Sequence, residues 1–432
     1  MKFSIVATGD SLMTARLPQN DPQNLALKKI FDKADVAFTN FEMTCHDYEV
    51  GAAAVSGGTW VSCRPPIIDD LKWLGFNMFA AATNHALDWN QDGLMLTIKH
   101  LKERGCSFAG VGANLAEASM PCYIDTPEGR VGMVSCCSSG KDWHIAGEAR
   151  PDVPGRPGMN YLRFDMVNYL TKEDLETLKT IINKTDVNAR QNQLAREGFE
   201  KASEGFAIGP SRFEVGEEPG TKTFCKKKDL ARLIQGVKEA RVQADVVLVS
   251  QHVHEFRGSN KGIAPDFEIE FAHACIDAGA DAFFGHGPHE MRGIEIYKGK
   301  PIFYSLGNFL FQSSTLERQP AEFFEKYNLG PANTVSEAYV VRSKNWTSGQ
   351  FANPKCFESF MTRFDVVDGE ITGVELLPIT LGFDKGLSRK GRPELASKKD
   401  GKRILAYLQS LCDEFGTKIE VKDGKGYITI KK

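Results

Sequence analysis

The feature that most constrains the fold is an alternation of short apolar runs and amphipathic stretches through about the first 120 residues. Strands are expected at 3–8, 35–40, 77–82 and 107–111, and helices at 25–33, 66–74 and 92–104. The last of these helices has Asp92 at its start and Gly105 after its end, both residues that cap helices. This βαβ order predicts an α/β fold.

The rest of the chain divides by its patterns. A hairpin is expected over 122–136, and an insertion over about 138–228 carries a long charged helical stretch at about 172–207. The α/β order then resumes to residue 312. We therefore expect a catalytic domain over 1–312, an irregular lobe or lid over 313–357, and strands and a helix over 358–432 that complete the fold.

Composition excludes several classes of function. The net charge of −3 gives no electrostatic reason to expect nucleic acid or an anionic membrane as a partner. No apolar run has the length of a membrane span, and Met1 leads directly into a strand-like stretch rather than a signal peptide. The ten cysteines form no CxxC pair, so we expect reduced thiols in a soluble, cytoplasmic protein.

Five segments place a metal-capable side chain just after a predicted strand. They are Thr8-Gly9-Asp10, Asn40-Phe41-Glu42, Thr83-Asn84-His85, Gln251-His252-Val253-His254-Glu255 and Gly285-His286-Gly287-Pro288-His289. In open α/β sheets, the loops at the carboxyl ends of the strands converge on one site. The sequence therefore predicts that these loops assemble one cluster of Asp, Glu, Asn and His side chains.

Each segment also has an ordinary structural interpretation. Asp10 alone is typical of a turn, Glu42 of a solvated loop, and one of the histidines 252 and 254 of a packed core. The segment from His286 to His289 is harder to explain in this way, because Pro288 prevents a helix there. Most of the nine histidines lie in or near these segments, which favours a metal site.

A mixed set of this kind suits hydrolysis by metal-activated water. Two divalent ions about 3.5–4 Å apart bind a substrate oxygen and generate hydroxide between them. A carboxylate bridges the ions, and neutral imidazoles suit Mn, Zn or Fe. A histidine that is not a ligand can protonate the leaving group.

The ordered segments resemble the CapA family, associated with poly-γ-glutamate capsule synthesis, within the calcineurin-like metallophosphoesterase superfamily. The resemblance covers most of residues 1–312. It is carried by Gly9-Asp10, Asn40-Phe41-Glu42, the run from Asn84 to Asp88 closing at Gly93, and the stretches 109–118 and 285–311. It implies a four-layer α/β/β/α sandwich of two mixed sheets, here with a helical insertion.

The resemblance also implies roles for single residues. The implied metal ligands are Asp10, Glu42, Asn84, His252, His286 and His289. His85 matches the histidine that protonates the leaving group, and Asp88 is placed to orient it. Leu12 stands where the superfamily usually has another histidine ligand, so we expect one or two divalent ions per chain.

Substrate contacts are expected from two places. Arg156 and Arg163 lie in the insertion loop, where they would grip a phosphate or carboxylate if the loop folds over the site. The alternative is a solvated loop with surface arginines. His254 and Glu255 replace a longer family pattern, and we assign them to the substrate while leaving a ligand role open.

Three functions fit these expectations. The site hydrolyses a phosphoester, or it cleaves a small amide of the γ-glutamyl type, or the chain is a non-catalytic accessory protein of capsule synthesis that binds metal and polyanion. Family members tied to capsule export usually carry a membrane anchor, and this sequence shows none. That favours an enzyme acting on a small or oligomeric anionic substrate, with no membrane or nucleic-acid partner. A homo-oligomer stays open.

Overall fold

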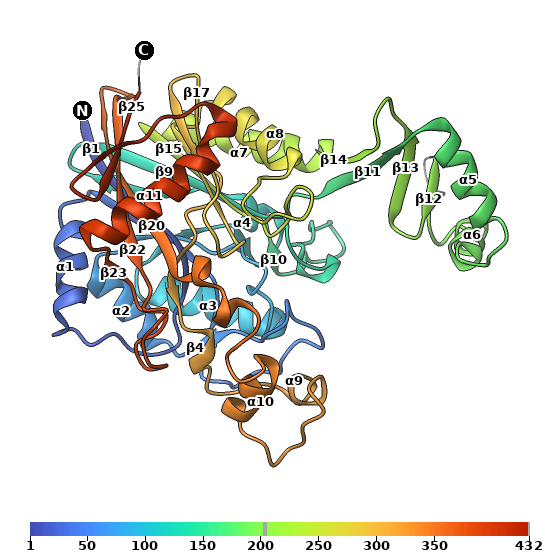
Figure 1. Ribbon diagram of the computed structural model, residues 1–432, viewed down its shortest axis with the longest axis horizontal. Helices are drawn as coiled ribbons and strands as arrows, with labels where there is room; N and C mark the ends of the chain where they lie inside the picture. The colour runs from blue at the N-terminus through green and yellow to red at the C-terminus, as the bar shows by residue number, and fades with distance from the viewer. Residues whose placement is uncertain (202–204, 431–432) are drawn as a thin grey trace.

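The computed structural model describes residues 1–201 and 205–430, and its largest sheet has eleven strands (Figure 1). The centre of this sheet is parallel: β1 (Lys2–Leu12), β2 (Val36–Phe41), β5 (Met78–Ala80) and β6 (Ser107–Ala109). β19 (Asn308–Phe311) pairs in parallel with the end of β1. Antiparallel strands from the C-terminal part extend the other edge: β20 (Glu358–Val367), β22 (Gly373–Thr380), β25 (Lys425–Thr429) and β24 (Glu420–Lys422). The sheet is therefore mixed.

A second sheet has six strands. Their order is β17 (Ile294–Tyr297), β18 (Lys300–Phe303), β16 (Ala282–His286), β15 (Val246–His252), β9 (Gly129–Cys137) and β8 (Cys122–Thr126). The four central strands are parallel, and an antiparallel hairpin closes each edge. The α/β class and the hairpin expected over 122–136 are both confirmed.

Both faces of β1 are buried, and alternate residues enter different cores. Phe3 and Ile5 share one cluster with Val131 and Leu248 from the second sheet. Val6 joins a different cluster, with Leu27 of α1 (Pro22–Phe31) and Leu71 of α2 (Pro66–Leu74). A third cluster joins α7 (Lys227–Gln243) and α8 (Asp266–Asp277) to the second sheet. Such continuous apolar strands are typical of parallel sheets covered on both faces.

The helix expected over 92–104 begins earlier. It is α3 (Asn90–Glu103), with Trp89 at the capping position and no side-chain cap. Asp92 lies within the first turn, where a carboxylate interacts favourably with the helix dipole without capping the backbone. Gly105 adopts φ +63° just beyond the helix, which agrees with its expected role in ending it.

The insertion differs from the long helix expected at about 172–207, and that prediction was wrong. The segment forms α5 (Lys172–Ile182) and α6 (Ala189–Arg196), and β12 (Phe206–Ile208) follows. Residues 202–204 lie outside the described residues. With β11 (Phe164–Leu170), β13 (Ser211–Val215) and β14 (Gly220–Cys225), the region builds a four-stranded sheet. Positive φ at Gly198 and Gly205 breaks the helical path.

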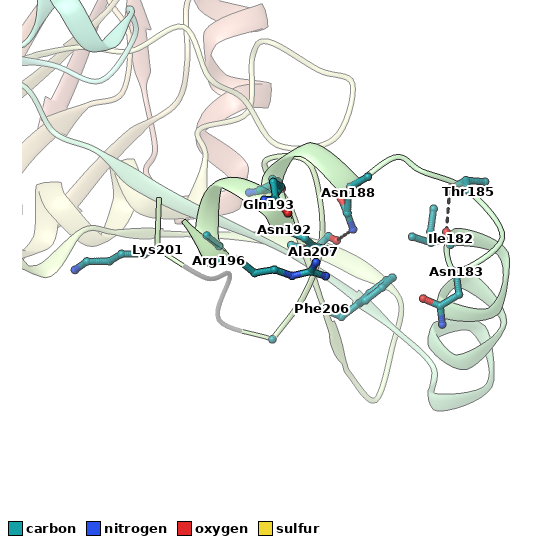
Figure 2. A pocket seen from close by; sticks show the side chains of 14 residues that line it. Ile182, Asn183, Thr185, Asn188, Asn192, Gln193, Arg196, Lys201, Phe206 and Ala207 are labelled. Atoms are coloured by element: carbon teal, nitrogen blue, oxygen red, sulfur yellow. Dashed lines mark hydrogen bonds between the residues drawn. The ribbon is translucent and has the colours of Figure 1, made fainter. Parts of the chain in front are cut away.

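This insertion projects from the two larger sheets as an arm (Figure 1). It carries a pocket of about 970 Å³ between α6 and β12. Figure 2 shows residues that line this pocket, including the polar Asn188 and Arg196 and the aromatic Phe206. The pocket lies on the arm and shares no residue with the strand-end loops of the two larger sheets.

The segment 313–357, here called the lobe, is more regular than expected. It contains α9 (Ala321–Glu325), α10 (Val335–Arg342) and three short 3₁₀ turns. A capping box between Thr334 and Glu337 starts α10. Phe323, Tyr339 and Phe351 are buried against the core beneath α1 and α2, so aromatic packing attaches the lobe to the larger sheet.

One close backbone approach fixes the first strand-end loop. A Cβ on Gly9 would lie 1.8 Å from the carbonyl oxygen of Gly307, so no other residue fits there. The amide of Asp10 donates to the same carbonyl at 2.9 Å. Asp10 is thereby held in register with Asn308 of β19.

Candidate metal centre

The predicted ligands lie at the carboxyl ends of parallel strands from both larger sheets. Asp10 is paired with Asn40 near the end of β1, Glu42 directly follows β2, and His252 and His286 occupy paired positions at the ends of β15 and β16. Parallel strands bring such ends to one edge. Contacts between these residues, described next, show that the two edges face each other.

Asp10 accepts hydrogen bonds from two neighbours. Asn40 Nδ2 donates to Asp10 Oδ1 at 2.8 Å, and the amide of Gly287 donates to Oδ2 at 3.1 Å. Asn40 Nδ2 also lies 3.0 Å from Nδ1 of His252. Complete burial raises the pKa of Asp10 to about 7, against the lowering effect of these hydrogen bonds.

Glu42 is the least compensated group in the site. Both of its carboxylate oxygens are buried and have no hydrogen-bond partner within residues 1–201 and 205–430. Its Oε1 lies 3.6 Å from His289 Nε2, 3.7 Å from His252 Nε2 and 4.0 Å from His85 Nε2. Burial, with help from Asp10 and Asp88, raises its pKa well above the usual value. A buried carboxylate without a partner is costly, and a cation would compensate it.

The surrounding imidazoles are in the form that binds metal. Burial lowers the pKa of His286 to about 3 and of His289 to about 4, and it lowers that of His252 as well. They are therefore neutral at pH 7. Asn84 Oδ1 lies 2.8 Å from His252 Nε2, and the Oδ1 of Asn308 lies 2.8 Å from His289 Nδ1.

One trio of ligand atoms is close enough to hold a single ion. Suitable atoms of Glu42, His254 and His289 all lie within 4.8 Å of one another. His254 Nε2 is buried without a partner. The sequence assigns His254 to the substrate and leaves a ligand role open, and the structure brings it among the predicted ligands. Its spacing from His252 could have indicated this position, because residues two apart in an extended segment point to the same side.

His85 and Asp88 form the expected pair. Nδ1 of His85 lies 2.5 Å from Asp88 Oδ2, which also accepts the amide of Val61 at 2.7 Å. A carboxylate at Nδ1 fixes the tautomer and orientation of the ring. Nε2 is then the nitrogen on the side of Glu42, and His85 lines the cavity described below.

The other expected substrate contacts are occupied elsewhere. Arg156 Nη2 donates to the carbonyl of Ile145 at 2.9 Å, and Arg163 pairs with Asp229 at 2.7 Å. Glu255 Oε2 accepts hydrogen bonds from the hydroxyls of Ser138 and Ser139. These three predicted contacts do not line the cavity beside the ligands, because each side chain satisfies a structural partner.

That cavity has a volume of about 360 Å³. His85, His254 and His289 line one wall, and residues of the lobe line the other. Leu12, which replaces a usual ligand, contributes an apolar side chain to the cavity. Its two cations, Lys261 and Arg342, were not identified from the sequence, because neither follows a predicted strand.

Known proteins resemble this chain over most of its length. The sequence model of the family described as bacterial capsule synthesis protein PGA_cap matches residues 4–313. An uncharacterized protein of Sinorhizobium fredii (strain NBRC 101917 / NGR234) is 32% identical over 443 residues, covering 99% of this chain and 93% of the relative.

Two further relatives have descriptive names. The PGA biosynthesis protein CapA of Bacillus subtilis (strain 168) is 43% identical over 190 residues, 35% of this chain and 49% of that protein. A probable polyglutamine synthesis accessory protein of Mycobacterium tuberculosis (strain ATCC 25618 / H37Rv) is 27% identical over 251 residues, 57% of this chain and 48% of that protein. In the described part of this chain, no helix is both long and apolar enough to span a bilayer.

Proposed function

Because this chain belongs to the PGA_cap family of bacterial capsule synthesis proteins, we propose that it is a metal-dependent hydrolase acting on a phosphoester or a small amide, including the γ-glutamyl type. One observation carries the proposal. Glu42 presents two buried, unpartnered oxygens to three imidazoles at the edge of a cavity. A site built only for stability would pair that charge.

The proposal includes the four-layer order of the superfamily. Its support is the distribution of apolar clusters: one shared by the two sheets, one between the larger sheet and α1 and α2, and one between the second sheet and α7 and α8. In that order the carboxyl ends of both parallel regions open toward the same site, as a centre with ligands from both sheets requires.

The donor set fits one or two divalent ions of Mn, Zn or Fe. The residues that would hold them are Asp10, Glu42, Asn84, His252, His254, His286 and His289. Bound there, such ions supply a hydroxide at neutral pH and polarise the scissile group. Burial keeps the imidazoles unprotonated for this role.

His85 supplies the proton in this proposal. Asp88 accepts the hydrogen bond of Nδ1–H, so the ring acts as an acid in its imidazolium form, in which Nε2–H faces the cavity and passes its proton to the leaving oxygen or nitrogen. Asp88 does not contact the substrate, and it acts by orienting the ring. The loop bearing Glu255, tied to Ser138 and Ser139, keeps His254 in place.

The second candidate is an accessory protein that binds metal and polyanion without turnover. Its support is the name of the relative described as a probable polyglutamine synthesis accessory protein. Both candidates require the metal, so only turnover separates them.

Metal analysis and a substrate screen test the proposal together. The full chain, as purified and after reloading with Mn²⁺, Zn²⁺ or Fe²⁺, should bind at least about one ion per chain. Phosphoesters and γ-glutamyl amides are then screened in parallel. Binding of less than about one ion under every condition contradicts both candidates. Stoichiometric binding without any turnover leaves the accessory role.

Replacement of the proposed acid is the sharper test. His85→Ala should lower kcat by about 10²–10⁴-fold while metal content stays unchanged, because the ring donates a proton and is not needed as a ligand. His273→Ala is the matched control, since His273 stacks on Tyr297 and pairs with Glu295 outside the cavity. An unaltered rate in His85→Ala would remove the assignment.

A further inference from the structure

Two cations face the cavity from positions outside the five segments predicted to carry ligands. Lys261 belongs to the loop between β15 and α8, and Arg342 ends α10 in the lobe. Both line the cavity together with His85, His254 and His289. Among the described residues, neither cation forms an ion pair with a carboxylate. Their charge is therefore available to a ligand.

Arg342 is held in place by neutral groups. Its guanidinium lies 5.7 Å from the ring centre of Tyr339 and 6.0 Å from that of Phe323. Its Nη1 donates to the hydroxyl of Thr59. The two aromatic rings and one hydrogen bond orient the planar guanidinium without compensating its charge. Its remaining N–H groups are left to donate to an anion.

Lys261 is positioned through its backbone. Its carbonyl accepts a hydrogen bond of 2.9 Å from Nε of Arg292, which also donates to the carbonyl of Glu255. Arg292 forms a fully buried ion pair with Glu268 at 2.7 Å. One buried guanidinium thus anchors the loop at two points. Lys261 lines the same cavity as His254 and His289.

We infer that Lys261 and Arg342 form an anion clamp that selects substrates bearing a second anionic group, separate from the bond placed at the metal ligands. The clamp joins two chain segments across one cavity, and Ser343, Ser348 and Gln350 add neutral polar groups beside it. A substrate with one anionic group would leave this charge unmatched. The inference rests on the proposed function only for the reaction itself, because anion binding is measurable without turnover.

The second anion is a carboxylate or a phosphate, and calorimetry with the full chain distinguishes them. One arm compares pyrophosphate with inorganic phosphate. The other compares γ-glutamyl-glycine, which has two carboxylates, with γ-glutamyl-glycinamide, which has one. Each arm is run on the metal-free and the Mn²⁺-loaded protein. We expect the probe with the additional anionic group to bind more tightly in the arm that matches the natural chemistry.

Substitution of the clamp should weaken that binding. Lys261→Gln and Arg342→Gln are each expected to raise the Kd of the preferred probe about tenfold, since each removes a charge-assisted contact. Arg342→Lys keeps the charge but loses the planar guanidinium, so its Kd should lie between that of the wild type and that of Arg342→Gln. Lys326→Gln, an exposed lysine of the same lobe, is the control and should bind as the wild type does. Thermal unfolding of each variant establishes that it is folded.

The outcomes separate the clamp from the reaction. If the Lys261→Gln, Arg342→Gln double variant binds as tightly as the wild type, or if the wild type prefers neither probe in either metal state, the clamp is refuted even where turnover is found. If the double variant loses binding and the wild type shows neither metal uptake nor turnover, the clamp stands and the hydrolase proposal fails. With turnover, KM for the charged substrate should rise more than kcat falls.

Discussion

The two walls of the cavity are built in different ways. The strand-end wall consists of loops fixed by two parallel sheets, with its ionisable groups buried and closely spaced. The lobe wall consists of short helices and turns, and its polar groups are buried or half-buried and are neutral apart from Arg342. The lobe contains none of the nine histidines of the chain.

This difference separates two tasks. Bond cleavage needs groups fixed to within a fraction of an ångström, which parallel strands and buried hydrogen bonds supply. Selectivity needs complementary charge at a distance from the reacting atoms, which a lobe attached by aromatic packing supplies. The strand-end wall should therefore respond to substitution in metal affinity and kcat, and the lobe wall in KM.

The largest expected effect comes from Glu42→Gln. Loss of the charge facing three imidazoles should lower metal affinity by more than about 100-fold, since losing even an outer partner of a metal costs about 10–100-fold. The metal-free protein should become more stable by about 1–3 kcal/mol, because an unpaired buried charge is removed. Metal titration and urea unfolding measure the two effects.

Glu322→Gln, on the exposed first turn of α9 in the lobe, is the control for that comparison. It should change neither the metal affinity nor the free energy of unfolding of the metal-free protein. If Glu42→Gln binds metal as the wild type does, the strand-end wall is not a metal centre around this carboxylate.

An effect on stability rather than on metal affinity is expected from Glu268→Gln, which tests the support beneath the same wall. Removing this charge leaves Arg292 buried and unpaired, which should cost about 3–5 kcal/mol in the free energy of unfolding. Glu42 and Glu268 are both buried, but of these two carboxylates Glu268 is the one with a cationic partner. Neutralising Glu268 should therefore destabilise the protein, whereas neutralising Glu42 should stabilise its metal-free form. Breaking a buried pair usually costs more than this variant would lose if its free energy of unfolding fell by less than about 1 kcal/mol. Such a small decrease would show that the burial of Arg292 does not depend on its ion pair with Glu268.

The smallest effect concerns pH. Burial lowers the pKa of His46, which packs against Tyr48 and Trp89, from 6.5 to about 4. Since the folded pKa is the lower one, the stabilisation is fully present above pH 6.5 and is lost as pH falls toward 4. His46→Gln should reduce the proton uptake on unfolding in that window by up to about one proton per chain. Unfolding curves at several pH values measure this proton uptake. A pH dependence of stability that is the same in His46→Gln and the wild type would contradict the lowered pKa of His46.

Much of the strand-end wall could be predicted from the sequence. Asp10, Glu42 and His252 lie at or near the ends of β1, β2 and β15, and the general behaviour of parallel strands predicts that such ends meet. Local patterns sufficed there because every predicted ligand lies within four residues of the end of a strand.

The lobe wall and the arm could not be predicted in the same way. Arg342 reaches the cavity only through packing of Tyr339 and Phe323, contacts between residues that no local period reveals. Arg163 looked available until the fold placed it beside Asp229, 66 residues away. In the arm, charged residues over 172–207 suggested one helix, while the strand residues of β12 are too few to show an alternation.

The contact between Gly9 and Gly307 has a consequence for laboratory evolution of the chain. A library that randomises Gly9 would yield almost no working members, because any side chain would push β19 away from β1 and move Asp10 from Asn308. Ser343, Ser348 and Gln350 face the same cavity without touching that backbone junction. Libraries aimed at new substrates should therefore vary the lobe and leave the glycine junction unchanged.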